Sequence, residues 1–168
     1  MKQKSVLLIS IFSFLLFSCG SSRPGFADNP PSKKGYIYAV GVASNKFEAE
    51  AISEAQTVAR TAISNELGMK NQSKVKRVTD TINSSDAVKG FKTLIDEYAS
   101  NSMSGVKTIK RDVNEKNGVY RAYILMELNE ADAQKRFLER IKSQKDVNDA
   151  LRVAGLYEEW ESEFSSKK

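Results

Sequence analysis

The chain has 168 residues, with 26 Lys and Arg against 21 Asp and Glu and a formal net charge of +5. It contains no histidine and one cysteine, Cys19. The absence of histidine excludes His-based catalytic triads and the common zinc sites. The mild positive excess is typical of a solvated surface and does not indicate a nucleic-acid partner.

Residues 1–18 have the layout of a secretory signal peptide. Lys2 and Lys4 precede an apolar run from Val6 to Phe17 that is interrupted only by serine. A helix that crosses a bilayer needs roughly 20 mostly apolar residues, so this run is too short to remain as a membrane span. We therefore expect the leader to be removed, which lowers the net charge to +3 by loss of the two lysines.

The leader ends in Leu16-Phe17-Ser18-Cys19, which resembles a lipobox because a small residue stands directly before the cysteine and an apolar one three positions before it. Phe17 departs from the small or β-branched residue that is usual between them. A thiolate is nucleophilic enough to accept a diacylglyceryl group. The sequence predicts cleavage before Cys19, lipidation of Cys19 with fatty acids such as palmitate, and membrane anchoring. The alternative is a chance cysteine in an ordinary secretory leader.

Acylation of Cys19 would leave only carboxylate, Lys, Ser or Tyr groups for catalysis. No Asp or Glu pair stands apart from the charges expected on helix surfaces. We predict no catalytic residue, no cofactor and no metal ligand, and therefore a protein that is not an enzyme.

Residues 19–34 are rich in Gly, Ser and Pro and predict a flexible tether, which is followed by one domain over residues 35–168. The domain opens with a β-rich run, Tyr36–Ala43, in which large and small residues alternate. The small residues are Ala39, Gly41 and Ala43. The side chains on this face of the strand are small, so a helix can approach the strand closely.

A long alanine-rich helix is predicted next. Asn45 and Glu48 have the spacing of a capping box, and Gly68 is placed to end the helix after Leu67. Its apolar stripe comprises Ile52, Ala55, Val58, Ala59, Ala62 and Ile63. Residues 69–83 fit either a helix or a strand and stay unassigned.

A second amphipathic helix and a hairpin follow. Ser84-Ser85 offers a cap for the helix. Its apolar side comprises Val88, Phe91, Leu94, Ile95 and Tyr98. Val106–Val113 and Val119–Leu128 flank Asn117-Gly118, a strong hairpin signal because both turn residues must tolerate positive φ.

The second hairpin strand has one face that should belong to the core. That face comprises Tyr120, Ala122, Ile124, Met126 and Leu128, with Ile109 and Val113 opposite. The other face carries Arg121 and Tyr123. This face is either exposed to solvent, covered by another segment of the chain, or used to bind a partner.

Two helical stretches complete the chain. Asn129 begins the first, with Glu130 and Asp132 in its first turn. Its inward side comprises Ala133, Phe137, Leu138 and Ile141. The second runs from about Asp146 to Phe164, with Gly155 as a weak point. Trp160 and Phe164 either pack on the domain or dock a partner or a second copy.

Three stretches together resemble the LPP twenty-kilodalton lipoprotein family of Gram-negative outer membranes. They are Tyr36–Ala43, the helix that carries Ala49, Ala51, Ala55, Ala59 and Ala62, and Ser104–Lys107 leading into the hairpin with Tyr120–Leu128. The resemblance implies an α+β domain in which a small antiparallel sheet, formed by the first strand and the C-terminal hairpin, packs against the long Ala-rich helix, with additional C-terminal helices. It implies residence on the outer membrane and no catalytic motif.

The leading hypothesis is a lipid-anchored, non-catalytic interaction or assembly module of the outer membrane, whose partners are envelope proteins or further copies of the chain. The alternative is a binder or carrier of a small apolar or polyanionic envelope molecule. A carboxylate enzyme that acts on cell-wall glycan is a third possibility. The one site residue we predict is Cys19; Tyr123, Arg121 and Trp160 are the next positions to mutate.

Overall fold

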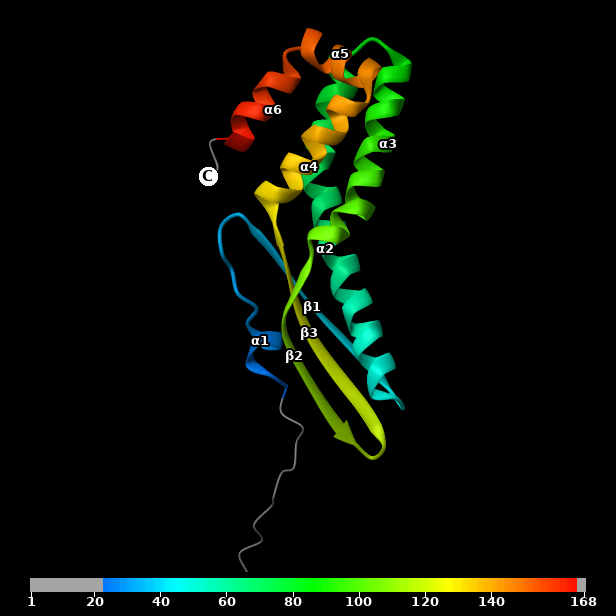
Figure 1. The fold of residues 1–168 in the computed structure, drawn as a ribbon, viewed down its shortest axis with the longest axis vertical. Coiled ribbons are helices and arrows are strands. Elements are labelled where there is room, and N and C mark those ends of the chain that lie inside the picture. The colour runs from blue at the N-terminus through cyan, green and yellow to red at the C-terminus, as the bar shows by residue number, and fades with distance from the viewer. Residues whose placement is uncertain (1–22, 166–168) are drawn as a thin grey trace, which may run out of the picture.

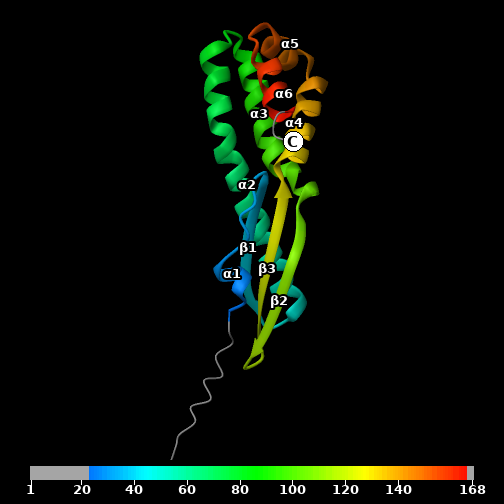
Figure 2. The same cartoon turned by 90° about the vertical axis from the view of Figure 1, so that its left-hand side faces the viewer.

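The computed structural model describes residues 23–165, except for the side chains of residues 99–103 and 164–165. Its elements in chain order are α1 (Gly25–Asp28), β1 (Tyr36–Asn45), α2 (Glu48–Thr81), α3 (Ser85–Asn101), the 3-10 helix η1 (Ser102–Gly105), β2 (Lys107–Lys116), β3 (Val119–Asn129), α4 (Glu130–Ser143), α5 (Lys145–Val153) and α6 (Leu156–Ser165). Figures 1 and 2 show an elongated molecule with the sheet in one half and a group of helices in the other, and α2 runs through both halves. Among residues 23–165, no helix is long and apolar enough to cross a bilayer.

The three strands form one antiparallel sheet in the order β1-β3-β2, with α2 packed on it, so the predicted α+β architecture is confirmed. Gly41 of β1 pairs with Ile124 of β3. Asn117 and Gly118 connect β2 to β3 with φ angles of 55° and 73°, which confirms the hairpin turn. The core face of β3 is the predicted one, because Ala122, Ile124, Met126 and Leu128 are buried.

The face of β1 with small side chains is where the helix approaches most closely. A Cβ atom built on Gly41 would lie 1.8 Å from the carbonyl oxygen of Ala55 and 2.8 Å from the nitrogen of Ala59, so the strand and the helix touch backbone to backbone. Ala51, Ala55 and Ala59 are fully buried at this contact. This confirms the predicted close packing of α2 on the small residues of β1.

The long helix corrects three sequence-based expectations. Gly68 does not end it: α2 continues to Thr81, because its buried side passes from the sheet to the helices of the other half. The capping box does not form, because Asn45 is the last residue of β1 and its Oδ1 accepts the Phe47 N–H at 3.1 Å. Val58, which is 47% exposed, and Ala62, which is also exposed, do not belong to the buried stripe.

The stripe was misplaced because the buried residues of α2 follow four-residue steps from Ala51 to Asn71. They are Ala51, Ala55, Ala59, Ile63, Leu67 and Asn71, and Val78 is buried farther along the helix. Each step advances about 40° around the helix, so the buried line winds about the axis as it climbs. This drift carries it from the twisted sheet to the helical half.

The hairpin and the last helix also depart from prediction at one residue each. Ile109 is exposed, because a β-bulge between Thr108 and Lys110 turns it away from the core. The last stretch is two helices, α5 and α6, because Gly155 adopts a φ of +70° that breaks the helix.

The remaining helix predictions are confirmed. Ser84 Oγ accepts the Ala87 N–H at 3.3 Å at the start of α3, and Asn129 Oδ1 accepts the N–H groups of Ala131 and Asp132 at the start of α4. Trp160 is buried, with its ring centre 5.6 Å from that of Phe91, so it packs on the domain. The side chain of Phe164 lies outside the described residues.

The middle of the outer face of the sheet, opposite α2, lies under α1 (Figure 1). Tyr123 and Leu125 are buried on this face, and Ala27 of α1 is buried with them. Residues 23–34 of the segment predicted as a tether therefore include a helix that lies against the sheet. Residues 19–22 lie outside the described part of the chain.

We predict that Gly41→Ala lowers the free energy of unfolding by about 3 kcal/mol, because neither backbone can yield to the added methyl group. Gly68→Ala is the matched control: nothing lies within 4 Å of a Cβ at that position, so it should raise the free energy of unfolding by about 1 kcal/mol through helix propensity. Urea unfolding measures both. Equal stabilities of the two variants would contradict the backbone contact.

Candidate functional site

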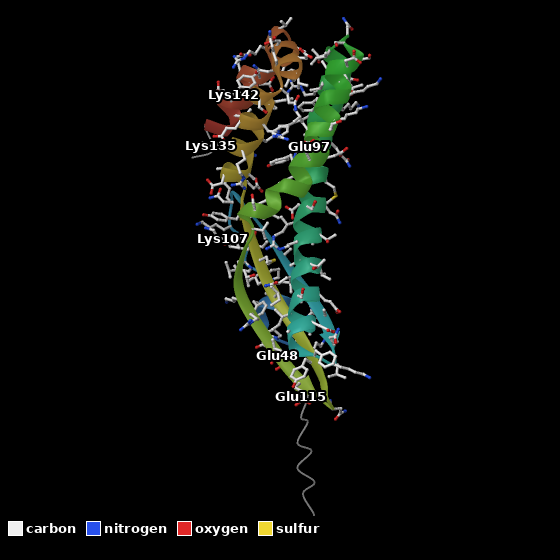
Figure 3. All side chains as sticks on the ribbon, turned by 45° about the vertical axis from the view of Figure 1, so that its right-hand side comes forward. Glu48, Glu97, Lys107, Glu115, Lys135 and Lys142 are labelled. Atoms are coloured by element: carbon white, nitrogen blue, oxygen red, sulfur yellow. The ribbon has the colours of Figure 1, made fainter. Side chains whose placement is uncertain are left out.

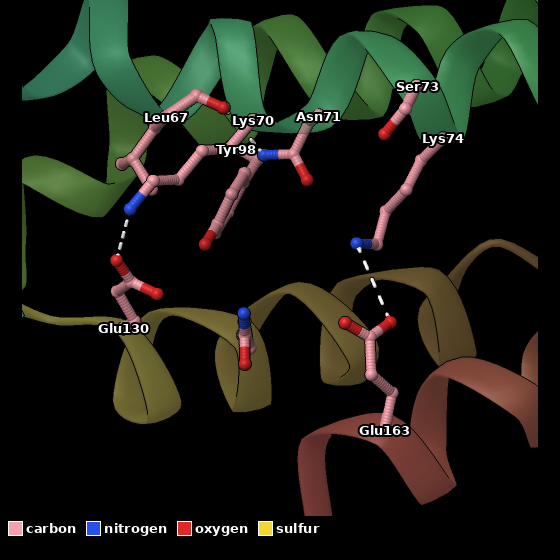
Figure 4. Close-up of a pocket in the computed structure, with 9 residues that line it drawn as sticks. Leu67, Lys70, Asn71, Ser73, Lys74, Tyr98, Glu130 and Glu163 are labelled. Atoms are coloured by element: carbon pink, nitrogen blue, oxygen red, sulfur yellow. Dashed lines mark hydrogen bonds and ion pairs between the residues drawn. The ribbon is translucent and has the colours of Figure 1, made fainter. Parts of the chain in front are cut away.

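The predicted site residue, Cys19, lies outside the described residues, so the structure supplies no geometry for it. Among the hollows in the described part of the chain, we consider two as candidates for a functional site. One is a polar cavity of about 330 Å³ between α2, α3, α4 and α6 (Figure 4). It is lined by Leu67, Lys70, Asn71, Ser73, Lys74, Tyr98, Glu130, Gln134 and Glu163.

The charges of the polar cavity are paired with each other. Lys70 forms ion pairs with Glu66, at 3.1 Å, and with Glu130. Lys74 Nζ lies 4.0 Å from a Glu163 oxygen and 5.9 Å from the centre of the Trp160 ring. A polyanionic ligand needs unpaired positive charge, and these pairs do not provide it.

Lys70 is not poised to act as a nucleophile or a base. Burial acts to lower the pKa of Lys70, but its hydrogen bonds to Glu130 and Glu66 outweigh that effect and raise the pKa above the ordinary value. The amine therefore stays protonated at neutral pH, and a protonated amine is neither a nucleophile nor a base.

Uncharged groups complete the polar lining. Asn71 is buried, and its Nδ2 donates to the Leu67 carbonyl at 2.9 Å while its Oδ1 points into the cavity (Figure 4). Tyr98 and Gln134 also face this space. Such a lining suits water or a small polar molecule, and it does not suit an apolar one.

The second hollow is an apolar groove of about 470 Å³ at the far end of the helical half. It is lined by Thr81, Ile82, Asn83, Asp149, Ala150, Val153 and Ala154, and we call it the α5 groove. Val153 is 92% exposed, although the opposite side of α5 buries Val147 and Leu151. Asp149, at the rim, forms no ion pair with any described residue.

The structure separates the three residues that the sequence singled out for mutation. Tyr123 is buried under α1, and the guanidinium of Arg121 lies 5.7 Å from its ring centre. Trp160 belongs to the core of the helical half. None of the three lines either hollow.

Metal-binding geometry is absent from the described residues, since no three His, Cys, Asp or Glu residues there are grouped to hold an ion. The chain matches no protein-family model, no curated protein and no solved structure. The family resemblance drawn from the sequence therefore remains a proposal.

One turn beyond the polar cavity, α2 is tied to α6 by a two-fold contact. Arg77 Nη1 and Nη2 donate to the two carboxylate oxygens of Glu159 at 2.5 and 2.7 Å. These hydrogen bonds hold the pKa of Glu159 below its ordinary value. The pair fixes the position of α6 beside the cavity.

We predict that NMR titration gives Glu159 a pKa below the ordinary glutamate value and that Arg77→Gln brings it back. Because the pKa is lowered in the folded state, the pair stabilises the fold at neutral pH, and this contribution is lost as the pH falls through the folded-state pKa. Arg152→Gln is the control, since Arg152 pairs with Glu158 instead. A Glu159 pKa that ignores Arg77→Gln would refute the contact.

Proposed function

We propose that this protein is a lipid-anchored, non-catalytic module of the outer membrane that binds another envelope protein through the α5 groove. The observation that carries the proposal is the exposure of Val153 beside Ile82, Ala150 and Ala154 at one end of the molecule. Anchoring at Cys19 comes from the lipobox pattern. The choice of the outer membrane comes from the family resemblance.

The groove favours a protein partner over a small molecule because it is open and apolar, with polar groups at its rim. An apolar side chain from a partner would cover Val153 and remove it from water. Asp149 adds a negative charge beside that contact. The partner we propose therefore presents an apolar side chain next to a Lys or Arg.

The position of the groove also supports this function. α1 begins six residues after Cys19 and lies against the sheet, whereas the groove is at the opposite end of α2 (Figures 1 and 2). A partner bound there meets no steric conflict with the anchored segment. The arrangement separates attachment from recognition.

Intact-mass analysis of membrane fractions tests the anchor. We expect a mature chain that begins at an acylated Cys19, and accumulation of the unprocessed chain when lipoprotein signal peptidase is inhibited. Cys19→Ala should abolish acylation and, because cleavage requires the acylated cysteine, should give the same unprocessed chain without inhibitor. A mature N-terminus at any other residue would contradict the lipidation.

Photo-crosslinking in intact cells tests the groove. A crosslinking amino acid at Val153 should give one discrete adduct with an envelope protein, joined at an apolar residue next to a cation. The same group at Val58, an exposed valine on α2, is the matched control and should give no such adduct. Asp149→Asn should lower the yield at Val153 if charge contributes to recognition.

Equal crosslinking at both positions would refute the groove as a specific site. An adduct with twice the mass of the chain would show self-association and would equally contradict the proposed partner.

A further inference from the structure

Two turns lie side by side at one end of the sheet. This end is the one farthest from the group formed by α3, α4, α5 and α6. They are the β1–α2 turn and the β2–β3 turn, and the pairing of Asn45 with Tyr120 brings them together. We call this region, residues 45–48 and 115–120, the hairpin end. Phe47 is 65% exposed and Val119 is 41% exposed there, so each turn presents an apolar side chain to its surroundings.

The fold itself does not account for Phe47. It occupies the N-cap of α2, where a residue with a side-chain oxygen is preferred, and its side chain makes no capping hydrogen bond within the described structure. Its exposed ring contributes little to the core. A contact with another molecule or with a membrane would remove the Phe47 ring from water.

The hairpin end has basic groups at its outermost positions. Lys46 precedes Phe47, and Lys116 pairs with Val119 across the hairpin turn. Neither ammonium has an ion-pair partner among the described residues. Glu48 and Glu115 lie at the same end (Figure 3), and Glu115 Oε1 is engaged by the Gly118 N–H at 2.8 Å.

The length of chain between the anchor and α1 limits how far this end can stand from a membrane. Phe26 follows Cys19 by seven residues, which span at most about 24 Å when fully extended. Phe26 of α1 lies at the level of Leu125, because its ring centre is 6.0 Å from Lys110 Nζ and Lys110 pairs with Leu125. Leu125 is six residues along β3 from Val119, or about 20 Å from the turn. The described chain enters α1 from the side of the hairpin turn (Figures 1 and 2).

The longest reach of this segment exceeds the distance to the hairpin turn by only about 4 Å, so a lipid on Cys19 can enter a bilayer no more than a few ångströms beyond the hairpin end. Arg23 folds back onto α1 itself: it forms an ion pair with Asp28 at 3.0 Å and donates to the Ala27 carbonyl at 3.1 Å. While α1 stays on the sheet, the hairpin end cannot stand clear of the membrane.

From this geometry we infer that the hairpin end is a second membrane contact, in which Phe47 and Val119 enter the boundary between headgroups and acyl chains. Lys46 and Lys116 then lie at the level of the lipid phosphates. The inference rests on the proposed anchoring at Cys19. It adds an orientation: the long axis stands on the membrane, with the α5 groove at the other end of a 34-residue helix about 50 Å long.

Tryptophan fluorescence of the full acylated protein tests the contact. The protein is bound to vesicles of phosphatidylethanolamine and phosphatidylglycerol, with or without bromine on the acyl chains. In Phe47→Trp, the added emission should shift to shorter wavelength and be quenched by brominated chains. Val153→Trp is the matched control and should show neither change. The native Trp160 is buried and contributes the same background to both.

Flotation of the same samples separates this inference from the proposed function. Protein that floats with the vesicles while Phe47→Trp stays unquenched would overturn the membrane contact and leave the anchor intact. Protein that fails to float would overturn the anchoring, and the contact with it.

A second variant tests the argument from chain length. Ala27→Glu places a charge in the buried contact of α1 and should release α1 from the sheet. The segment between Cys19 and the folded domain then extends to Gly35, 16 residues after Cys19. Quenching of Phe47→Trp should then fall while flotation persists. Unchanged quenching after release of α1, confirmed by increased proteolysis of residues 23–34, would overturn the inference.

Discussion

At Gly41 the backbone of β1 meets the backbone of α2 at Ala55 and Ala59, with no side chain between them. This contact sets the distance between helix and sheet, and the other residues along the seam are small for the same reason. Ala51, Ala55 and Ala59 bury completely, so the larger core residues of β3, such as Ile124 and Met126, fill the space to either side. This seam sets the orientation of α2 over the sheet. It thereby also sets the position of the helices that pack on the C-terminal half of α2.

Local patterns predicted the elements that local chemistry specifies. The alternation around Gly41, the Asn117-Gly118 turn and the Asn129 cap each fix a backbone conformation within a few residues, and each is observed. The run after Gly68 could not be assigned, because its helical state depends on burial of Val78 against distant helices. The stripe on α2 was displaced because a twisted sheet, which the sequence does not display, makes the buried line drift.

The candidate functional surfaces were harder to predict from the sequence. The polar cavity joins Lys70 and Lys74 to Glu130 and Glu163, which are brought together only by the continuation of α2 and the fold of the last helices. Phe47 was overlooked because Asn45 and Glu48 have the spacing of a capping box. That pattern predicts Asn45 as the N-cap, whereas Phe47 occupies the N-cap with an exposed ring. Val153 lies on an amphipathic helix that buries Val147 and Leu151, and only the break at Gly155 shows which side of that helix stays exposed.

The unbroken course of α2 has a mechanical consequence. A helix without a proline or an interruption has no hinge, and Gly68 lies within it without bending the chain away from the helical path. The sheet and the group of helices therefore move together as one rigid body. A small change in tilt at the sheet becomes a large sideways displacement of α5, while the distance between α5 and the sheet stays constant.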